Sequence, residues 1–286
     1  MASMREIKRR RSSIQSTQQI TKAMKLVSTV KLQRARTNAE NTKIYFEYMY
    51  RTMHSMFAKI EADDHPYVSG NGSKKIGIVT VTSNRGLAGG YNANIVRMVD
   101  KSEFAKEDIC LYTVGRKGAE GFARKGYEIV EDYSDVIDEP QFSDARKIGE
   151  QLLKDYNDGK IGEIYIAYTE FKNTVSQIPK LIKVLPMGKT PEENSDNVDN
   201  LSPMTFEPSE EEAIALLVPK YIASILYGTF VEALASENGA RMQAMDSATN
   251  NAEEIINDLE LKYNRARQGA ITQELTEIIA GAEAIG

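Results

Sequence analysis

Residues 245–259 read MDSATNNAEEIINDL, and this stretch decides the fold. Its apolar positions step by three and four residues: Met245, Ala248, Ala252, Ile255 and Leu259. That spacing is typical of the narrow seam along which one long helix packs on another. Further along, the apolar positions are Tyr263, Ala266 and Ala270, then Ile271, Leu275, Ile278, Ala282 and Ile285. The sequence therefore predicts a coiled-coil helix at the C-terminal end.

The N-terminal end has a similar pattern. The apolar positions expected to form its seam are Ile20, Ala23, Val27 and Val30, followed by Tyr45, Met49, Thr52 and Met56. A long helix with so thin an apolar stripe is not stable alone in water. Because an inserted domain returns the chain to its start, we expect the two ends to pack on each other as antiparallel helices.

Helix-breaking residues divide the chain. All eight prolines lie between Pro66 and Pro219, and the first 69 residues contain no glycine. Inside a helix, proline costs about 3 kcal/mol and glycine about 1 kcal/mol. We therefore expect a helix over 1–60, an inserted domain over 74–187, an acidic loop and foot segment over 188–208, and a helical segment over 209–286. In that last segment, Ser209 is expected to cap a short helix, and the main helix to begin near Pro219.

The middle of the chain alternates between two kinds of pattern. Strands are expected at 76–82, 109–114, 127–130, 163–169 and 177–185, and helices at 92–101, 115–125 and 142–156. Such alternation is typical of a mostly parallel, Rossmann-like sheet flanked by helices, here with the last strand antiparallel. The predicted fold class is thus α/β plus coiled coil.

Charge is unevenly spread along the chain. The net charge is −5, yet residues 1–36 carry ten basic side chains and one acid, Glu6. A nucleic-acid arm, a mitochondrial presequence and a helix face docking on an acidic partner all fit such a stretch. No aromatic residue occurs before Tyr45 to stack on bases, and the helical pattern runs past any cleavage point, so we favour the acidic protein partner. No run of eighteen apolar residues predicts a membrane span.

Residues 83–92, SNRGLAGGYN, are the strongest candidate for a ligand-binding loop. They follow a strand and open a helix, where nucleotide-binding loops lie. They match neither the Gly-Lys-Ser/Thr motif nor G-x-G-x-x-G, so a tight turn packed against the coiled coil is the simpler interpretation. Cys110, His54 and His65 have no partners at metal-ligand spacing. We expect no catalytic, cofactor-binding or metal site.

Three segments resemble the gamma subunit of F-type ATP synthases: 20–35, 82–92 and 235–282. The likeness covers essentially the whole chain. It implies a non-catalytic rotor, present once per complex, whose coiled coil stands inside an α3β3 hexamer with the catalytic sites on beta. It also implies contacts with the epsilon subunit and the c-ring, without direct membrane insertion. The implied location is the cytoplasmic face of a bacterial cell membrane, as a peripheral protein.

The resemblance also implies roles for individual residues. Contacts with the hexamer fall on Lys22, Met24, Lys25, Arg241, Arg267, Gln268 and Glu274. Foot contacts with epsilon and the c-ring fall on Phe206 and Glu207. A bearing tip falls on Ile271, Leu275, Ile278, Ala282 and Ile285.

The chain departs from the family pattern at three positions: Asn84 replaces the usual Asp, Ala88 a frequent Cys, and Gly239 an Ala. Two alternative functions remain open from the residues alone. One is a soluble coiled-coil tether with a ligand-sensing α/β domain, and the other is a nucleotide-dependent enzyme built on the middle domain.

Overall fold

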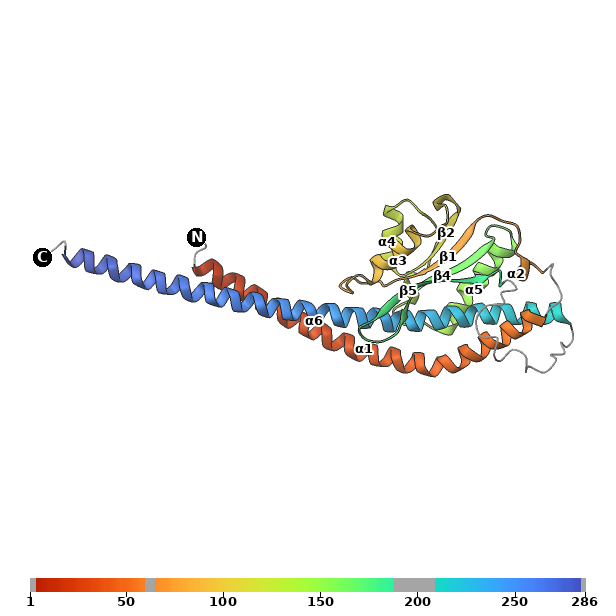
Figure 1. Ribbon diagram of the computed structural model, residues 1–286, viewed down its shortest axis with the longest axis horizontal. Coiled ribbons are helices and arrows are strands. Elements are labelled where there is room, and N and C mark those ends of the chain that lie inside the picture. The colour runs from red at the N-terminus through yellow and green to blue at the C-terminus, as the bar shows by residue number, and fades with distance from the viewer. Residues whose placement is uncertain (1–3, 60–64, 188–208, 284–286) are drawn as a thin grey trace. The chain divides into compact units, whose positions relative to one another are not determined.

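The computed structural model describes residues 4–59, 65–187 and 209–283. The chain divides into two compact units. The first, which we call the helical pair, comprises Met1–Ser28 and Met242–Gly286. The second, the α/β unit, comprises Thr29–Arg241. Two long helices, α1 (Met4–Lys59) and α6 (Glu210–Glu283), each contribute to both units (Figure 1).

In the helical pair, α1 and α6 run antiparallel, as predicted. Arg11 contacts Glu260 at 3.2 Å, the Thr21 hydroxyl lies 2.8 Å from that of Thr249, and Lys25 contacts Asp246 at 2.6 Å. The residue numbers in each pair add up to 270 or 271, which places Met4 opposite residue 267. The end of α6 therefore runs past the start of α1 (Figure 1).

The seam predicted for α1 is wrong by one helix position. Ile20 and Val27 are 60% and 58% exposed, whereas Ile7, Thr21 and Ser28 are buried. Thr21 and Ser28 are small hydroxyl-bearing residues, and the Thr21 hydroxyl hydrogen-bonds to that of Thr249 across the pair, so counting apolar residues misplaced the seam. On α6 the prediction holds for Met245, Ala252 and Leu259, but Ile256 replaces Ile255.

The α/β unit contains one five-stranded sheet, in the order β3-β2-β1-β4-β5. Its strands are β1 (Ile76–Val81), β2 (Ile109–Val114), β3 (Glu128–Asp132), β4 (Glu163–Phe171) and β5 (Gln177–Leu185). The first four are parallel, and β5 pairs antiparallel with β4. The predicted strands and the direction of the last one are confirmed.

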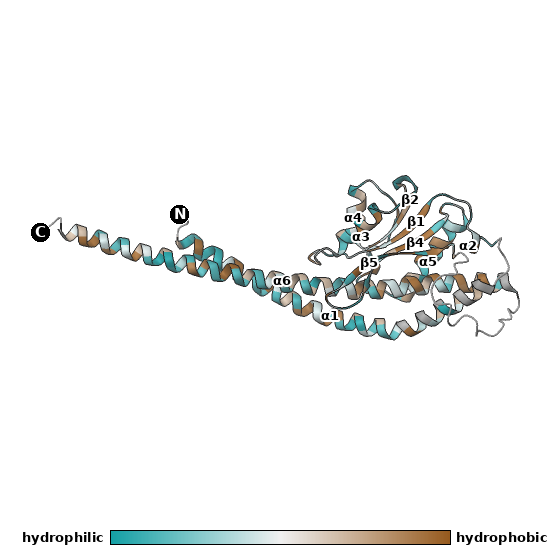
Figure 2. Cartoon of the chain, in the orientation of Figure 1, coloured by the Kyte–Doolittle hydropathy of each residue, from teal (hydrophilic) through white to brown (hydrophobic). Residues whose placement is uncertain are grey.

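Helices cover both faces of this sheet. On one face lie α3 (Tyr91–Asp100) and α4 (Arg116–Arg124), which share a core with Ile78 and Leu111. On the other face α5 (Phe142–Asn157), α6 and α1 share a core that includes Val79 and Tyr112. Figure 2 shows that the strands, which lie between these two layers of helices, are mostly hydrophobic. Short helices complete the unit: α2 (Pro66–Ser69), η1 (Lys106–Asp108) and η2 (Ser134–Val136).

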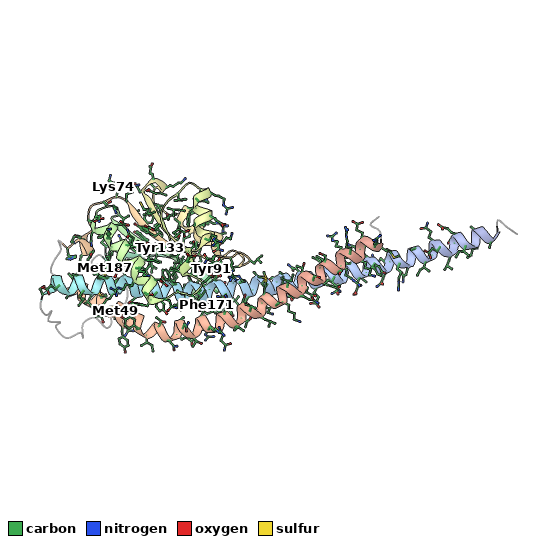
Figure 3. The ribbon with its side chains drawn as sticks, turned by 180° about the vertical axis from the view of Figure 1, so that it is seen from behind. Met49, Lys74, Tyr91, Tyr133, Phe171 and Met187 are labelled. Carbon is green, nitrogen blue, oxygen red and sulfur yellow. The ribbon has the colours of Figure 1, made fainter. Side chains whose placement is uncertain are left out.

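In the α/β unit, α1 packs through methionines. Met53 and Met56 are almost fully buried, and Met49 packs against the same core (Figure 3). Tyr45 is 51% exposed and Thr52 is exposed, so their predicted place in the seam is wrong. In this unit α1 packs against a hydrophobic core and not along a second helix, so its most apolar side chains are the ones that become buried.

The α6 helix is continuous from Glu210, so the predicted short helix before Pro219 is wrong. Ser209 does cap it, because the Ser209 hydroxyl accepts the backbone N–H of Glu212 at 3.2 Å. Among the described residues, α6 holds an 18-residue window of mean hydropathy 1.6, long and apolar enough by composition to cross a membrane. However, 61% of that window is buried inside the protein. This part of α6 packs against both α1 and the sheet, and a helix that is buried on several sides is apolar on several sides.

Candidate functional site

The loop after β1, residues 83–90, lies where α/β domains bind nucleotides, beside the point where the strand order reverses between β1 and β4. It is closed by its own hydrogen bonds. The Ser83 backbone N–H donates to Asn92 Oδ1 at 2.9 Å, and the Ser83 hydroxyl donates to the Arg85 carbonyl at 2.7 Å. These contacts agree with the simpler interpretation of the motif, a tight turn.

Arg241 of α6 holds this loop in place through hydrogen bonds. Its guanidinium donates to the carbonyls of Arg85 and Gly86, each at 3.4 Å, and contacts Glu237 at 2.7 Å. A phosphate site at a helix start needs backbone N–H groups that point at the ligand. Here two carbonyl oxygens point at an arginine of the same chain. The loop is therefore arranged to pack on α6.

The Glu237–Arg241 pair is buried, with 5% and 9% of the two residues exposed. Burial raises the pKa of Glu237, and Arg241 opposes that rise. Nearby, the Tyr91 hydroxyl donates to the Ala233 carbonyl at 3.1 Å, which joins α3 to α6 (Figure 3). Glu237 was not among the residues predicted from the sequence, although its position four residues before an arginine is a recognisable helical ion-pair spacing.

Leu87 is the one non-glycine residue with positive φ in the described part of the chain, at 63°. Its side chain is 62% exposed. Such a backbone conformation persists only where the surroundings enforce it, and it concentrates at functional positions. The braced loop thus holds a leucine and the exposed Arg85 outward, and this surface was absent from the sequence-based expectations.

Of the three departures from the family pattern, Asn84 makes specific hydrogen bonds. The Asn84 side-chain amide donates to the Ser134 carbonyl at 2.7 Å, and its oxygen accepts the Arg116 N–H at 2.9 Å. An aspartate could accept at this position but could not donate. At Gly239, a Cβ atom would lie 3.4 Å from the side chains of Gln177 and Phe171, which is about van der Waals contact, so the space beside α6 has room for the alanine usual in the family. Ala88 is buried at 2% exposure.

The structure places the residues expected to meet partners in different environments. Lys22 is exposed on α1, whereas Met24 and Lys25 are half-buried. Arg241 lies inside the α/β unit and is bound to Glu237. Phe206 and Glu207 lie outside the described residues.

The tip, which we define as residues 268–283 of α6, continues beyond the level of Met4. Ile271, Leu275 and Ile278 are 49%, 54% and 67% exposed, and Ala282 is exposed too. Gln268 and Glu274 are exposed in the tip, as is Arg267 just before it. Ile285 lies outside the described residues. The tip therefore presents an apolar stripe to its surroundings.

A cationic collar lies at the base of the tip. We define it by seven exposed residues of the two antiparallel helices: Arg5, Lys8, Arg9, Arg10, Lys262, Arg265 and Arg267. Arg11 beside them pairs with Glu260, and Lys262 pairs with Asp258. The remaining positive charge fits an acidic surface around the helices.

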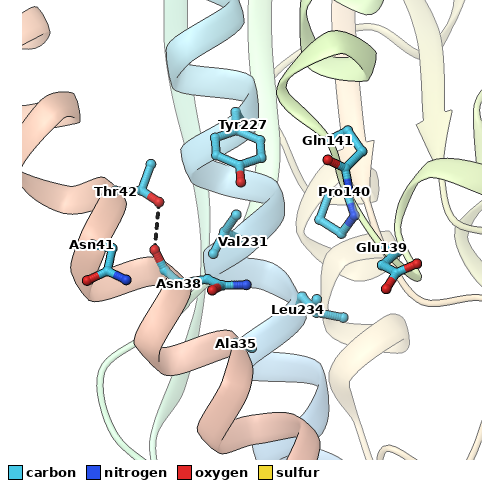
Figure 4. A pocket seen from close by; sticks show the side chains of 10 residues that line it. All are labelled: Ala35, Asn38, Asn41, Thr42, Glu139, Pro140, Gln141, Tyr227, Val231 and Leu234. Atoms are coloured by element: carbon cyan, nitrogen blue, oxygen red, sulfur yellow. Dashed lines mark hydrogen bonds between the residues drawn. The ribbon is translucent and has the colours of Figure 1, made fainter.

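A pocket of about 420 Å³ lies in the α/β unit between α1, α6 and the segment before α5 (Figure 4). Its polar lining consists of Asn38, Asn41, Thr42, Glu139, Gln141 and Tyr227. This set can form hydrogen bonds but contains no nucleophile with an adjacent base. Within the described ranges, no three His, Cys, Asp or Glu side chains form a group that could hold a metal ion.

Comparisons with known proteins agree with this architecture. A family model described as ATP synthase matches residues 3–285. The chain is 59% identical to the ATP synthase gamma chain of Lachnoclostridium phytofermentans, over the full length of both. It is 38% identical to a gamma chain of Acetobacterium woodii described as sodium ion specific, over 99% of this chain and 98% of that one.

Solved structures share the fold. A chain of the Euglena gracilis mitochondrial ATP synthase (OSCP/F1/c-ring) aligns with a TM-score of 0.72 at 19% identity, over 99% of this chain and 94% of that one. A chain of the Tetrahymena thermophila mitochondrial ATP synthase (central stalk/c-ring) aligns with a TM-score of 0.60 at 24% identity, over 80% and 99%. The predicted resemblance and fold class are confirmed, and the chain belongs to the ATP synthase gamma chain family.

Proposed function

We propose that this chain is the central-stalk rotor of an F-type ATP synthase, and that it transmits torque without catalysing a reaction itself. The observation that supports this most directly is the apolar tip above a cationic collar. Apolar contact is non-directional, so a helix can turn inside an apolar sleeve without breaking a fixed set of bonds. A static tether would gain more from directional, paired contacts.

Contacts with the α3β3 hexamer follow from the same surfaces. The tip residues Ile271, Leu275, Ile278, Ala282 and Ile285 would turn in the sleeve, and Arg267, Gln268 and Glu274 would meet polar groups of beta around it. Lys22, Met24 and Lys25 would meet acidic segments of beta lower on the shaft. Arg241 would act indirectly, by holding the loop that presents Arg85 and Leu87.

The remaining partners rest on the family. One copy of the chain would stand in each complex, with its foot, including Phe206 and Glu207, on the epsilon subunit and the c-ring. The complex would lie at the cytoplasmic face of the cell membrane and couple proton flow to ATP turnover. The chain would help to regulate both. The ring selects the ion, and the Acetobacterium woodii relative is described as sodium ion specific.

The rotor proposal can be tested in a subcomplex of this chain with its alpha and beta subunits. Leu275→Glu places a charge in the proposed sleeve, where burial of an unpaired carboxylate is costly. Leu216→Glu is the matched control, because Leu216 is a 61% exposed leucine of the same helix in the α/β unit. We expect ATP-driven rotation, observed on single molecules, to slow by about tenfold or stop for Leu275→Glu only.

The same preparation separates rotor from tether. A rotor should co-purify with three alpha and three beta subunits per copy, and a probe fixed to the α/β unit should revolve during ATP hydrolysis. Hydrolysis with a stationary probe would favour the tether. Equal rotation rates for Leu275→Glu and Leu216→Glu would show that the tip does not turn inside an apolar sleeve.

A further inference from the structure

The pocket between α1, α6 and residues 139–141 has an apolar interior and a polar rim (Figure 4). Ala35 and Val231 are buried in its lining, and Leu234 is half-buried beside them. The exposed lining is polar and consists of Asn38, Asn41, Glu139 and Gln141. Its volume is about 420 Å³, and a concave site of this size with a few polar groups around an apolar interior is typical of small-molecule sites.

The walls of the pocket are well supported by the α/β unit. The Thr42 hydroxyl donates to the Asn38 carbonyl at 2.6 Å, within α1. The Tyr227 ring lies edge-on to Phe142, with 5.8 Å between the ring centroids, so the start of α5 holds the tyrosine in place. Figure 4 shows Tyr227 between the α1 side chains and Gln141. A molecule in the pocket would therefore touch three segments that are far apart in sequence.

The polar groups at this pocket are not used by the fold. Within the described residues, the side chains of Asn38, Asn41 and Tyr227 and the carboxylate of Glu139 form no hydrogen bond or ion pair. By contrast, Arg36 on the same turn of α1 is paired, with its Nε 2.8 Å from a carboxylate on the next turn. Two amides, a hydroxyl and a carboxylate thus remain available to a ligand.

Charge decides which class of molecule fits this lining. Glu139 is its one charged side chain, the exposed Asp138 precedes it, and no lysine, arginine or histidine lines the pocket. Phosphates, nucleotides and carboxylates would be repelled here. An ammonium group would gain a charge-assisted hydrogen bond from Glu139, and a chain of methylene groups would cover Val231 and Leu234.

We propose that this pocket binds a short aliphatic polyamine. One ammonium group meets Glu139, the hydrocarbon body lies on Val231 and Leu234, and the far end donates to the amide oxygens of Asn38 and Asn41. The bound polyamine bridges α1, α6 and residues 139–141, so it fastens the N-terminal helix to the α/β unit. The proposal concerns a different surface from the tip and the collar, and it does not depend on rotation.

An NMR titration of the full chain with spermidine tests the site. The methyl signals of Val231 and Leu234 should shift in a saturable way and show contacts with the methylene protons of the amine. Glu139→Gln should weaken binding about tenfold, because one charge-assisted hydrogen bond is lost. Glu103→Gln is the matched control, because it removes the same charge from an exposed glutamate of the α/β unit outside the pocket. It should bind spermidine as the wild type does.

A second variant and a second probe separate the pocket from general attraction to an acidic protein. Asn38→Leu leaves the net charge unchanged and suits an exposed helix position, yet it should weaken binding about fivefold because an amide acceptor is lost. The neutral chain 1,8-octanediol should leave the methyl signals unchanged at the same concentration. Equal affinity of Glu139→Gln and Glu103→Gln would overturn the proposal. So would equal binding of the diol, or shifts that spare Val231 and Leu234.

Discussion

The two parts of α6 differ sharply in what surrounds them. In the α/β unit, residues 221–226 and 235–239 are buried on every side, with Phe230 at 0% exposure. In the helical pair, α6 buries only a seam of Met245, Ala252, Ile256 and Leu259, and beyond Ala270 every described side chain is exposed. One continuous helix is thus core in the α/β unit and mostly solvent-exposed in the helical pair. Stability should then depend on the first part and partner binding on the second.

The largest expected effect separates these two parts. Phe230→Ala should lower the free energy of unfolding by about 4 kcal/mol, because it removes a fully buried ring and leaves a cavity. Leu275→Ala in the tip should change it by less than about 0.5 kcal/mol, because that leucine is already in solvent. Guanidinium denaturation of the full chain, followed by circular dichroism, measures both. A tip variant as unstable as the core variant would contradict the division.

The next effect compares ion pairs. Glu237→Gln should cost about 3 kcal/mol, because it leaves the buried Arg241 without its carboxylate. The control, Glu260→Gln in the helical pair, removes the exposed partner of Arg11 and should cost less than about 1 kcal/mol. Hydrogen exchange should also increase in loop 83–90 for Glu237→Gln alone. Similar losses in both variants would mean that water reaches the Glu237–Arg241 pair.

Sequence patterns predicted some parts of this molecule well for physical reasons. The β2 strand, Ile109–Val114, was found to the residue because a β-branched and aromatic run lies between breakers. Ile20 and Val27 misled the α1 seam because the pattern counts apolar residues, whereas close helix packing here uses Thr21 and Ser28. The sequence pattern predicts a helix start near Pro219, yet α6 continues through this proline, because it is packed on both sides there.

The site residues divide in a similar way. The tip and the collar are visible in sequence, since apolar spacing and charge persist without a partner in the same chain. Arg241 could be recognised as a cation, but its burial depends on loop 83–90 folding back onto α6.

A smaller effect sharpens the role of the braced loop. Asn84→Asp should cost about 1–2 kcal/mol, because the carboxylate cannot donate to the Ser134 carbonyl and would face Asp138. Asn84→Ser, which keeps a small hydroxyl donor, should lose less. Urea denaturation of the full chain measures the difference. If Asn84→Asp left the free energy of unfolding unchanged, the loop would tolerate the residue usual in the family without rearrangement.

The smallest effect on stability lies at Lys25, where it tests function instead. The Lys25–Asp246 pair lies in the helical pair with side chains 40% and 47% exposed, so Lys25→Gln should change the free energy of unfolding by no more than about 0.5 kcal/mol. If Lys25 meets an acidic segment of beta during rotation, the same variant should alter the coupling of ion flow to ATP turnover in the complete complex. Asp246→Asn is the matched control, because it breaks the same intramolecular pair and leaves the lysine charge in place. Changed coupling in Lys25→Gln but not in Asp246→Asn would assign the lysine to the partner. Equal changes in both would assign it to the packing of α1 on α6, and the shaft contact would then have to lie elsewhere on the exposed face of α1.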